Sequence, residues 1–375
     1  MSRLTLFHVG FLFLILFFTT TAKAQKEAET FNVDSTLYEY YQRCQEYLLE
    51  PVVLSMSDTL FRMAGERHDE RMQAVAIATR LDYYYFQGTN EDSVIHYTNK
   101  VKEFAKATHQ PKYYYFAWAN RLITYYLKTS RTNIALYEVQ NMLKEAQEED
   151  DKTGLSRCYN IMSQIYTIKR FDSMAFEWRL KEIELTEKYN IENYNISQTY
   201  AQIANYYISQ KKQKEALRAV EKAVSTANSS TQQISAKLEY VNYYSKFGDF
   251  QAAEKILKEC QIAFEQDKRL ESIKKRLYNI ECLYYQQTKQ YQKALEAAEM
   301  QEKEEHRLSE SILSSSHYRT QGEIYQKMGN MNMAVKYLQM YINTDDSLKI
   351  ANEQVASSEF ATLLNVEKLN AEKKE

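Results

Sequence analysis

The sequence predicts an all-α solenoid, and two observations carry this prediction. Tyrosines recur along the chain with successive gaps of 37, 42, 40, 41, 37, 41 and 40 residues. A fixed period between about 20 and 50 residues is typical of repeat proteins, in which each unit packs against its neighbours. The chain also has only 7 Gly and 2 Pro in 375 residues, which favours helix joined to helix over turn-rich β folds. The recurring tyrosines are Tyr47, Tyr84, Tyr126, Tyr166, Tyr207, Tyr244, Tyr285 and Tyr325.

Each copy of the repeat predicts a helical hairpin. In the last copy an aromatic, a small residue and a tyrosine stand at i, i+4 and i+7, a Gly-Asn turn follows, and a second helical pattern begins. Nine residues after most of the recurring tyrosines stands a small residue, as expected where two helices cross closely. These residues are Ser93, Ala135, Ala175, Ala216, Ala253, Ala294 and Ala334, whereas the first copy has Met56.

The pattern of Tyr318, Gly322 and Tyr325 followed by Gly329 and Ala334 resembles the tetratricopeptide repeat (TPR). The resemblance covers about residues 34 to 346 and implies a solenoid of about eight TPR-like hairpins with a C-terminal capping helix. The period is near 40 instead of the usual 34, which implies helices about one turn longer. The turn glycine is present in only three copies, at positions 88, 248 and 329.

The two ends of the chain differ from the repeats, so the predicted organisation is 1–24, 25–346 and 347–375. Arg3, an apolar run from Leu6 to Phe18 and the sequence Ala22-Lys23-Ala24 predict a secretory signal peptide cleaved before Gln25. The apolar run is shorter than the roughly 20 residues that span a bilayer, and no other segment is long enough. A retained anchor is the alternative. We therefore expect an exported protein without a membrane span after cleavage.

The last segment predicts a charged helix. Leu348, Val355, Thr362 and Leu369 follow a seven-residue step, which leaves open a two-stranded coiled coil and a homodimer. The order of signal peptide, tyrosine-rich repeats and charged helix resembles the periplasmic region of repeat-containing membrane regulators of Gram-negative bacteria. The resemblance implies a periplasmic sensor or adaptor whose charged helix leads toward a membrane span. A soluble periplasmic scaffold for envelope assembly is the second hypothesis, and a glycan-binding protein is the third.

The TPR resemblance also implies a ligand groove along the first helices of the repeats. Its groove positions carry asparagines, whose amides both donate to and accept from a peptide backbone. An ordinary solvated helix face is the alternative interpretation. Ala201 and Leu238 stand where the carboxylate-binding version of these repeats has lysine, so the sequence does not support that version. The candidate groove residues are Asn120, Asn160, Asn205, Asn242 and Asn279, with Arg157, Arg276 and Arg319 nearby.

Other functional classes have little support in the sequence. A formal charge of −2 provides no general attraction for nucleic acid. The histidines are scattered, and neither a Gly-rich phosphate loop nor a metal-binding spacing is present, so we expect no catalysis, cofactor or metal. The partner that remains is a protein or peptide. Cys260 and Cys282 fall in neighbouring predicted helices, and whether they form a disulfide is left open.

Overall fold

The computed structural model describes residues 33–347, except 89, 192 and 308–315. The described residues contain helices and no strand, as the sequence predicts. The predicted signal peptide and most of the predicted tail helix lie outside them. The chain divides into two compact units, Met1–Ile161 and Met162–Glu375.

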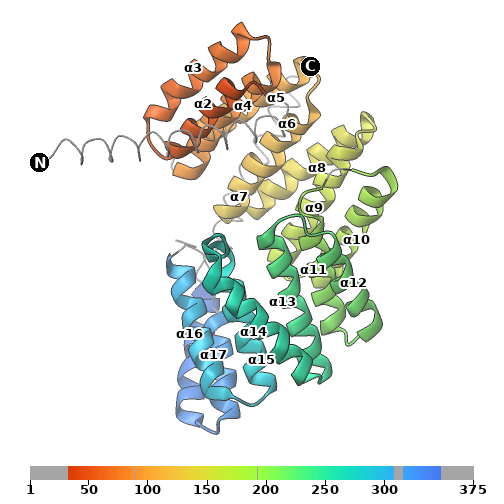
Figure 1. Ribbon diagram of the computed structural model, residues 1–375, viewed down its shortest axis with the longest axis vertical. Coiled ribbons are helices and arrows are strands. Elements are labelled where there is room, and N and C mark those ends of the chain that lie inside the picture. Colours follow the sequence, from red (N-terminus) through yellow and green to blue (C-terminus); the bar gives the residue numbers. More distant parts are fainter. Residues whose placement is uncertain (1–32, 89, 192, 308–315, 348–375) are drawn as a thin grey trace, which may run out of the picture. The chain divides into compact units, whose positions relative to one another are not determined.

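Unit 1 consists of successive antiparallel hairpins (Figure 1). Within the third hairpin, the first helix contains a π-helical stretch, η1, which provides room for the longest gap in the tyrosine spacing. The elements are α2 (Ser35–Glu46), α3 (Val52–Glu66), α4 (Glu70–Gln87), α5 (Glu91–Ala107), α6 (Pro111–Tyr115), η1 (Phe116–Ile123), α7 (Thr124–Lys128), α8 (Thr132–Glu148) and the first part of α9 (Lys152–Ile168).

Unit 2 continues the pattern, and α13, α14, α15 and α16 lie side by side in it (Figure 1). Its elements are the end of α9, α10 (Asp172–Tyr189), α11 (Ile196–Ser209), α12 (Gln213–Ser225), α13 (Ser230–Phe247), α14 (Phe250–Gln266), η2 (Lys268–Ile273), α15 (Lys274–Gln287), α16 (Tyr291–Arg307), α17 (Ser316–Lys327) and a helix over 331–347. The described residues of both units therefore form eight consecutive hairpins.

The recurring small residues lie in the second helix of each hairpin, and the alanines are more deeply buried than the serine. The six alanines are at most 2% exposed, whereas Ser93 is half-buried. Most of the recurring tyrosines are half-buried, because their rings lie over the second helix of the same hairpin. Tyr84 stacks on Tyr97 at a centroid distance of 5.3 Å, and Tyr325 stacks on Tyr337 at 5.4 Å.

The hairpin turns share one backbone geometry although most lack glycine. The residue four positions after the recurring tyrosine has a positive φ in seven hairpins. Glycine occupies this position in three of them, and only glycine adopts it without cost. In the other four the position is occupied by Ser130 (φ 61°), Arg170 (60°), Lys211 (58°) and Lys289 (60°). The absence of glycine from a repeat thus does not indicate a different turn.

Candidate functional site

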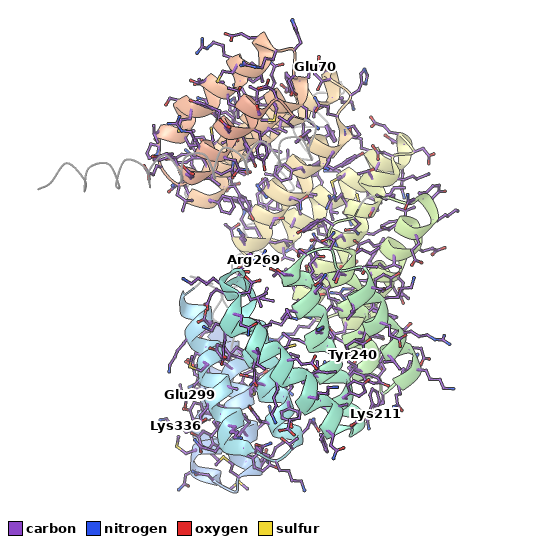
Figure 2. The ribbon with its side chains drawn as sticks, viewed as in Figure 1. Glu70, Lys211, Tyr240, Arg269, Glu299 and Lys336 are labelled. Carbon is purple, nitrogen blue, oxygen red and sulfur yellow. The ribbon has the colours of Figure 1, made fainter. Side chains whose placement is uncertain are left out.

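Unit 2 contains a cavity of about 540 Å³ between the N-terminal parts of the first helices of three consecutive hairpins, α11, α13 and α15. Figure 2 labels Arg269 in η2, at the edge of the unit where these helices begin, and Lys211 in the α11–α12 turn. The cavity is lined by Asn195, Ser197, Gln198, Ala201, Thr231, Gln232, Ser235, Ala236, Ser272, Ile273, Lys275, Arg276, Asn279 and Gln301.

The lining is polar and has no negative charge. Nine of its fourteen side chains are amides or hydroxyls, and two, Lys275 and Arg276, are cations. Among the residues that the structure describes, neither a carboxylate nor an aromatic ring lines the cavity. Such a surface can exchange many hydrogen bonds with a polar ligand.

Helix packing and helix capping position the side chains that line the cavity. Helix α11 packs against α12 through Ala204 and Ala216, both fully buried, and the Ser197 hydroxyl donates to the Ala223 carbonyl oxygen at 2.7 Å. Helix α13 begins at an N-cap, where Ser229 Oγ accepts from the Gln232 backbone N–H at 3.2 Å. The small residues keep the helices close, so the first turns present their polar side chains to the cavity.

A buried ion pair joins α13 to α15 beside the cavity. Glu239 is only 1% exposed, and its Oε1 accepts a hydrogen bond from Nη2 of Arg276, which lines the cavity. Burial raises the pKa of Glu239, whereas the Arg276 guanidinium and the nearby Asn242 and Asn205 amides act to lower it. Within the described part of the chain, Glu239 Oε2 and Arg276 Nε have no hydrogen-bond partner.

The structure brings four of the eight candidate groove residues into this region. Arg276 and Asn279 line the cavity, and Nδ2 of Asn242 donates to Oδ1 of Asn205 at 2.7 Å beside Glu239. This hydrogen bond joins α13 to α11. The role of these four residues in binding a ligand stays a prediction.

The other four candidates lie outside the cavity lining. Asn120 lies in η1, and Asn160 and Arg157 lie in the part of α9 that belongs to unit 1. Arg319 on α17 is largely exposed and pairs with Glu323 at 2.8 Å. These residues do not contribute to the unit 2 cavity.

The sequence analysis did not identify Glu239 as a site residue, because a carboxylate in a helical repeat usually lies on a solvent-exposed helix face. A pattern that could have identified Glu239 is a pair of oppositely charged residues that are one repeat apart in the sequence. Glu239 and Arg276 are 37 residues apart, and the same relation holds in unit 1 for Asp82 and Arg121, 39 residues apart and 17% or less exposed at their side chains.

The described residues show the state of the cysteines and of the residues that could bind a metal ion. Cys260 and Cys282 are buried free thiols, as are Cys44 and Cys158, and burial raises the pKa of Cys260 to about 11. Among the described residues no cluster of three or more His, Cys, Asp or Glu side chains could hold a metal ion. No helix in the described ranges has the length and hydrophobicity that a bilayer crossing needs.

Comparison with known proteins identifies the fold but no sequence relative. No family model matches the chain, and no curated protein matches it. Solved structures with TM-scores of 0.53 include RapI in its apo form, 15% identical over 72% of this chain and 98% of that one. Another is the Rap conjugation gene regulator of plasmid pLS20 in complex with the Phr* peptide, 11% identical over 78% of each chain. A third is the apo form of the quorum sensor NprR from B. thuringiensis, 14% identical over 85% of this chain and 91% of that one.

The period, the paired helices and the structural neighbours agree on one architecture. The chain has an all-α, TPR-like fold of consecutive helical hairpins.

Proposed function

We propose that this protein is a non-catalytic peptide- or protein-binding solenoid and that the cavity between α11, α13 and α15 is its ligand site. The observation that carries the proposal is the lining, in which amides and hydroxyls make up nine of fourteen residues. A peptide backbone alternates donors and acceptors, and side chains that offer both match it without demanding one sequence. The structure of a regulator of similar fold with the Phr* peptide supports the proposal as a precedent.

The cavity disfavours the glycan alternative. Sugar rings are commonly held by stacking on aromatic side chains, and none of the described residues that line the cavity is aromatic. In the aromatic run at 113–116, which lies in unit 1, Tyr114 and Tyr115 are buried.

Export and a sensor or adaptor role are part of the proposal. They are supported by the signal-peptide pattern in residues 1–24 and by the resemblance to periplasmic regulator regions. A periplasmic scaffold remains the second candidate function, since it would use the same cavity. Ligand-dependent change in a downstream response would separate the sensor from the scaffold.

We predict that the chain produced in a Gram-negative host is cleaved after Ala24, because small residues at 22 and 24 fit the cleavage-site rule. Mass spectrometry of the periplasmic fraction should find Gln25 as the first residue. An Ala24→Asp variant should accumulate uncleaved, whereas Lys23→Gln should be processed normally. An intact N-terminus on membrane-bound protein would instead support the retained anchor.

Peptide binding can be tested by selecting peptides from a random display library and measuring their affinities by calorimetry. A Gln198→Ala/Asn279→Ala variant removes two amides that line the cavity. Each lost hydrogen bond should cost about 1 kcal/mol, so we expect an affinity loss of roughly tenfold or more. Arg319→Gln changes an exposed residue outside the cavity and serves as the matched control. Equal binding by both variants would remove the cavity assignment, and failure to select any peptide would count against the function.

A further inference from the structure

We propose that a second cavity, in unit 1, binds an alkylammonium group, and that the side chains of Tyr115, Glu149 and Asp151 accept its hydrogen bonds. The cavity has a volume of about 310 Å³ and lies where α5 and α8 end and α6 and α9 begin (Figure 1). It shares no residue with the unit 2 cavity of the proposed function. The inference requires an unpaired group in the cavity, a lining that favours a cation, and walls that suit an alkyl chain.

The hydroxyl group of Tyr115 is the unpaired group. Tyr115 lines the cavity and is 1% exposed, and its hydroxyl oxygen has no hydrogen-bond partner among the described residues. A buried hydroxyl group without a hydrogen bond costs free energy, and such groups are few in folded proteins. Burial raises the pKa of Tyr115, and the charges of Asp151 and Glu149 raise it further, so both carboxylates lie near the hydroxyl. A ligand that donates to this oxygen would supply the missing partner.

The charged side chains of the lining favour a cation. Its carboxylates are Glu149 and Asp151, and its lysine is Lys106. The Lys106 ammonium donates to Oε1 of Glu149 at 2.9 Å and to Oε1 of Glu145 at 3.1 Å, so two carboxylates already share it. His109 also lines the cavity and is exposed. Within the lining, the charge of Asp151 thus has no lysine of its own, and a ligand cation would complement it.

The acceptors match the donors of an ammonium group. An alkylammonium group carries three N–H donors and no acceptor. The Tyr115 oxygen and the carboxylates of Glu149 and Asp151 are three acceptors on the lining. Oδ1 of Asp151 also accepts from the backbone N–H of Gly154 at 3.0 Å, and a carboxylate has lone pairs for further hydrogen bonds. The contact of Lys106 with two carboxylates shows that this region already accommodates one group of the same chemistry.

Apolar groups form other parts of the walls. Ala105 and Tyr114 are buried, and both line the cavity together with Pro111. The Tyr114 hydroxyl donates to Oε1 of Glu145 at 2.6 Å, which fixes the orientation of the ring. Small-molecule sites combine apolar walls with a few polar groups and have volumes from about 300 Å³ upward. The cavity therefore suits a short alkylamine, with its charge on the carboxylates and its chain on the apolar walls.

Binding can be measured by saturation-transfer NMR on the signals of small probes mixed with the full chain. n-Butylammonium and 1,4-diaminobutane carry the proposed group, n-butanol lacks the charge, and n-butyrate has the opposite charge. We expect the two amines to bind at least about fivefold more tightly than butanol or butyrate, because hydrogen bonds between charged groups are the strong ones.

A further probe, N-acetyl-lysine N-methylamide, separates two sources of the same group. Weaker binding of this probe than of n-butylammonium would assign the site to a free alkylamine, which is the result we expect from the size of the cavity. Tighter binding would assign the site to a lysine side chain of a peptide.

Three variants each change one acceptor. Tyr115→Phe removes the hydroxyl group, Glu149→Gln removes a charge, and Asp151→Asn removes a charge but keeps a side chain that can cap a helix. Each should weaken the binding of n-butylammonium by about five- to tenfold. Glu148→Gln is the matched control, because Glu148 is exposed and lies outside the lining next to Glu149 in the sequence. It should leave the affinity unchanged.

The stability of Tyr115→Phe separates binding from a structural role of the hydroxyl group. Because this group has no partner among the described residues, its removal should leave the midpoint of thermal unfolding unchanged or raise it. A lower midpoint without weaker binding would remove Tyr115 from the site. Equal binding of n-butylammonium and butanol, or equal affinities of Glu149→Gln, Asp151→Asn and Glu148→Gln, would overturn the ammonium site. None of these results would affect the peptide site proposed in unit 2.

Discussion

Arg276→Met is expected to destabilise unit 2 by about 3 kcal/mol at neutral pH. Glu239 is 1% exposed and accepts from Arg276, so the variant leaves a buried carboxylate without its counter-charge. Removing one partner of a buried ion pair typically costs about 3–5 kcal/mol, because the desolvation of the remaining charge is no longer offset. The Arg276 side chain is 29% exposed, which places the expectation at the lower end. Urea denaturation followed by circular dichroism measures the change.

The pH dependence of the stability of Arg276→Met identifies the cause of its destabilisation. Burial already raises the pKa of Glu239, and loss of Arg276 should raise it further. A carboxyl group whose pKa is higher in the folded state binds protons more tightly there. Its contribution to the free energy of unfolding is therefore complete below the pKa of glutamate in the unfolded chain, about 4.3. This contribution is lost as the pH rises through the pKa of the folded state. The free-energy deficit of Arg276→Met should shrink when the pH falls from 7.5 to 5.

A double variant supplies the control for this interpretation. Glu239→Gln/Arg276→Met has no ionisable group at the pair, so it should be more stable than Arg276→Met at pH 7.5 and should lack the recovery on acidification. A deficit that does not depend on pH in the single variant would show that lost packing of the Arg276 side chain, and not the buried charge, causes the destabilisation.

The fold could be predicted from the sequence because its determinants repeat. The crossing alanines, such as Ala216 and Ala253, are fully buried at the positions that the period indicates. The turn geometry could be predicted only in part from the sequence. Lys211 and Lys289 adopt the left-handed conformation that a glycine indicates in other repeats. In these turns the backbone N–H of the next residue donates to the carbonyl oxygen of the recurring tyrosine, as Lys212 does to Tyr207 at 2.9 Å, and this bond favours the left-handed conformation whatever the side chain.

The candidate site was harder to predict because it depends on geometry between repeats. Asn205 and Asn242 occupy matching positions, but their contact with each other depends on the separation of α11 and α13. The burial of Glu239 is a property of the assembled unit, and in the sequence it is indicated by nothing more than the 37-residue spacing to Arg276. Sequence therefore indicated polar residues along first helices but not which of them would meet around a cavity.

Gly154→Ala is expected to destabilise unit 1 by about 3 kcal/mol. A Cβ on Gly154 would lie 2.3 Å from Cζ and 2.4 Å from the hydroxyl oxygen of Tyr115, far inside van der Waals contact. Tyr115 is 1% exposed and its ring is rigid, so the added methyl group would force the whole ring to shift. Overpacking of a filled core usually costs about 1–3 kcal/mol, and the rigid neighbour places this site at the upper limit.

Two comparisons make this prediction specific to the Tyr115 contact. Gly65→Ala in α3 also places a methyl group on a helix of unit 1, but there it meets the end of the flexible Gln73 side chain, at 2.9 Å. Because alanine favours helix by up to about 1 kcal/mol over glycine, Gly65→Ala should be neutral or slightly stabilising. Thermal and urea unfolding should therefore show that the two substitutions change the free energy of unfolding in opposite directions or by clearly different amounts.

The second comparison is a double-mutant cycle. Tyr115→Leu shortens the side chain and opens space above Gly154, at a cost of its own because a buried ring is lost. In the Tyr115→Leu background, Gly154→Ala should cost less than 1 kcal/mol, so the two changes should couple by about 2 kcal/mol. Additive costs would mean that the Gly154 effect comes from the start of α9 itself. A strong coupling would establish that the recurrent aromatic core of this protein depends on a glycine that the repeat pattern does not predict.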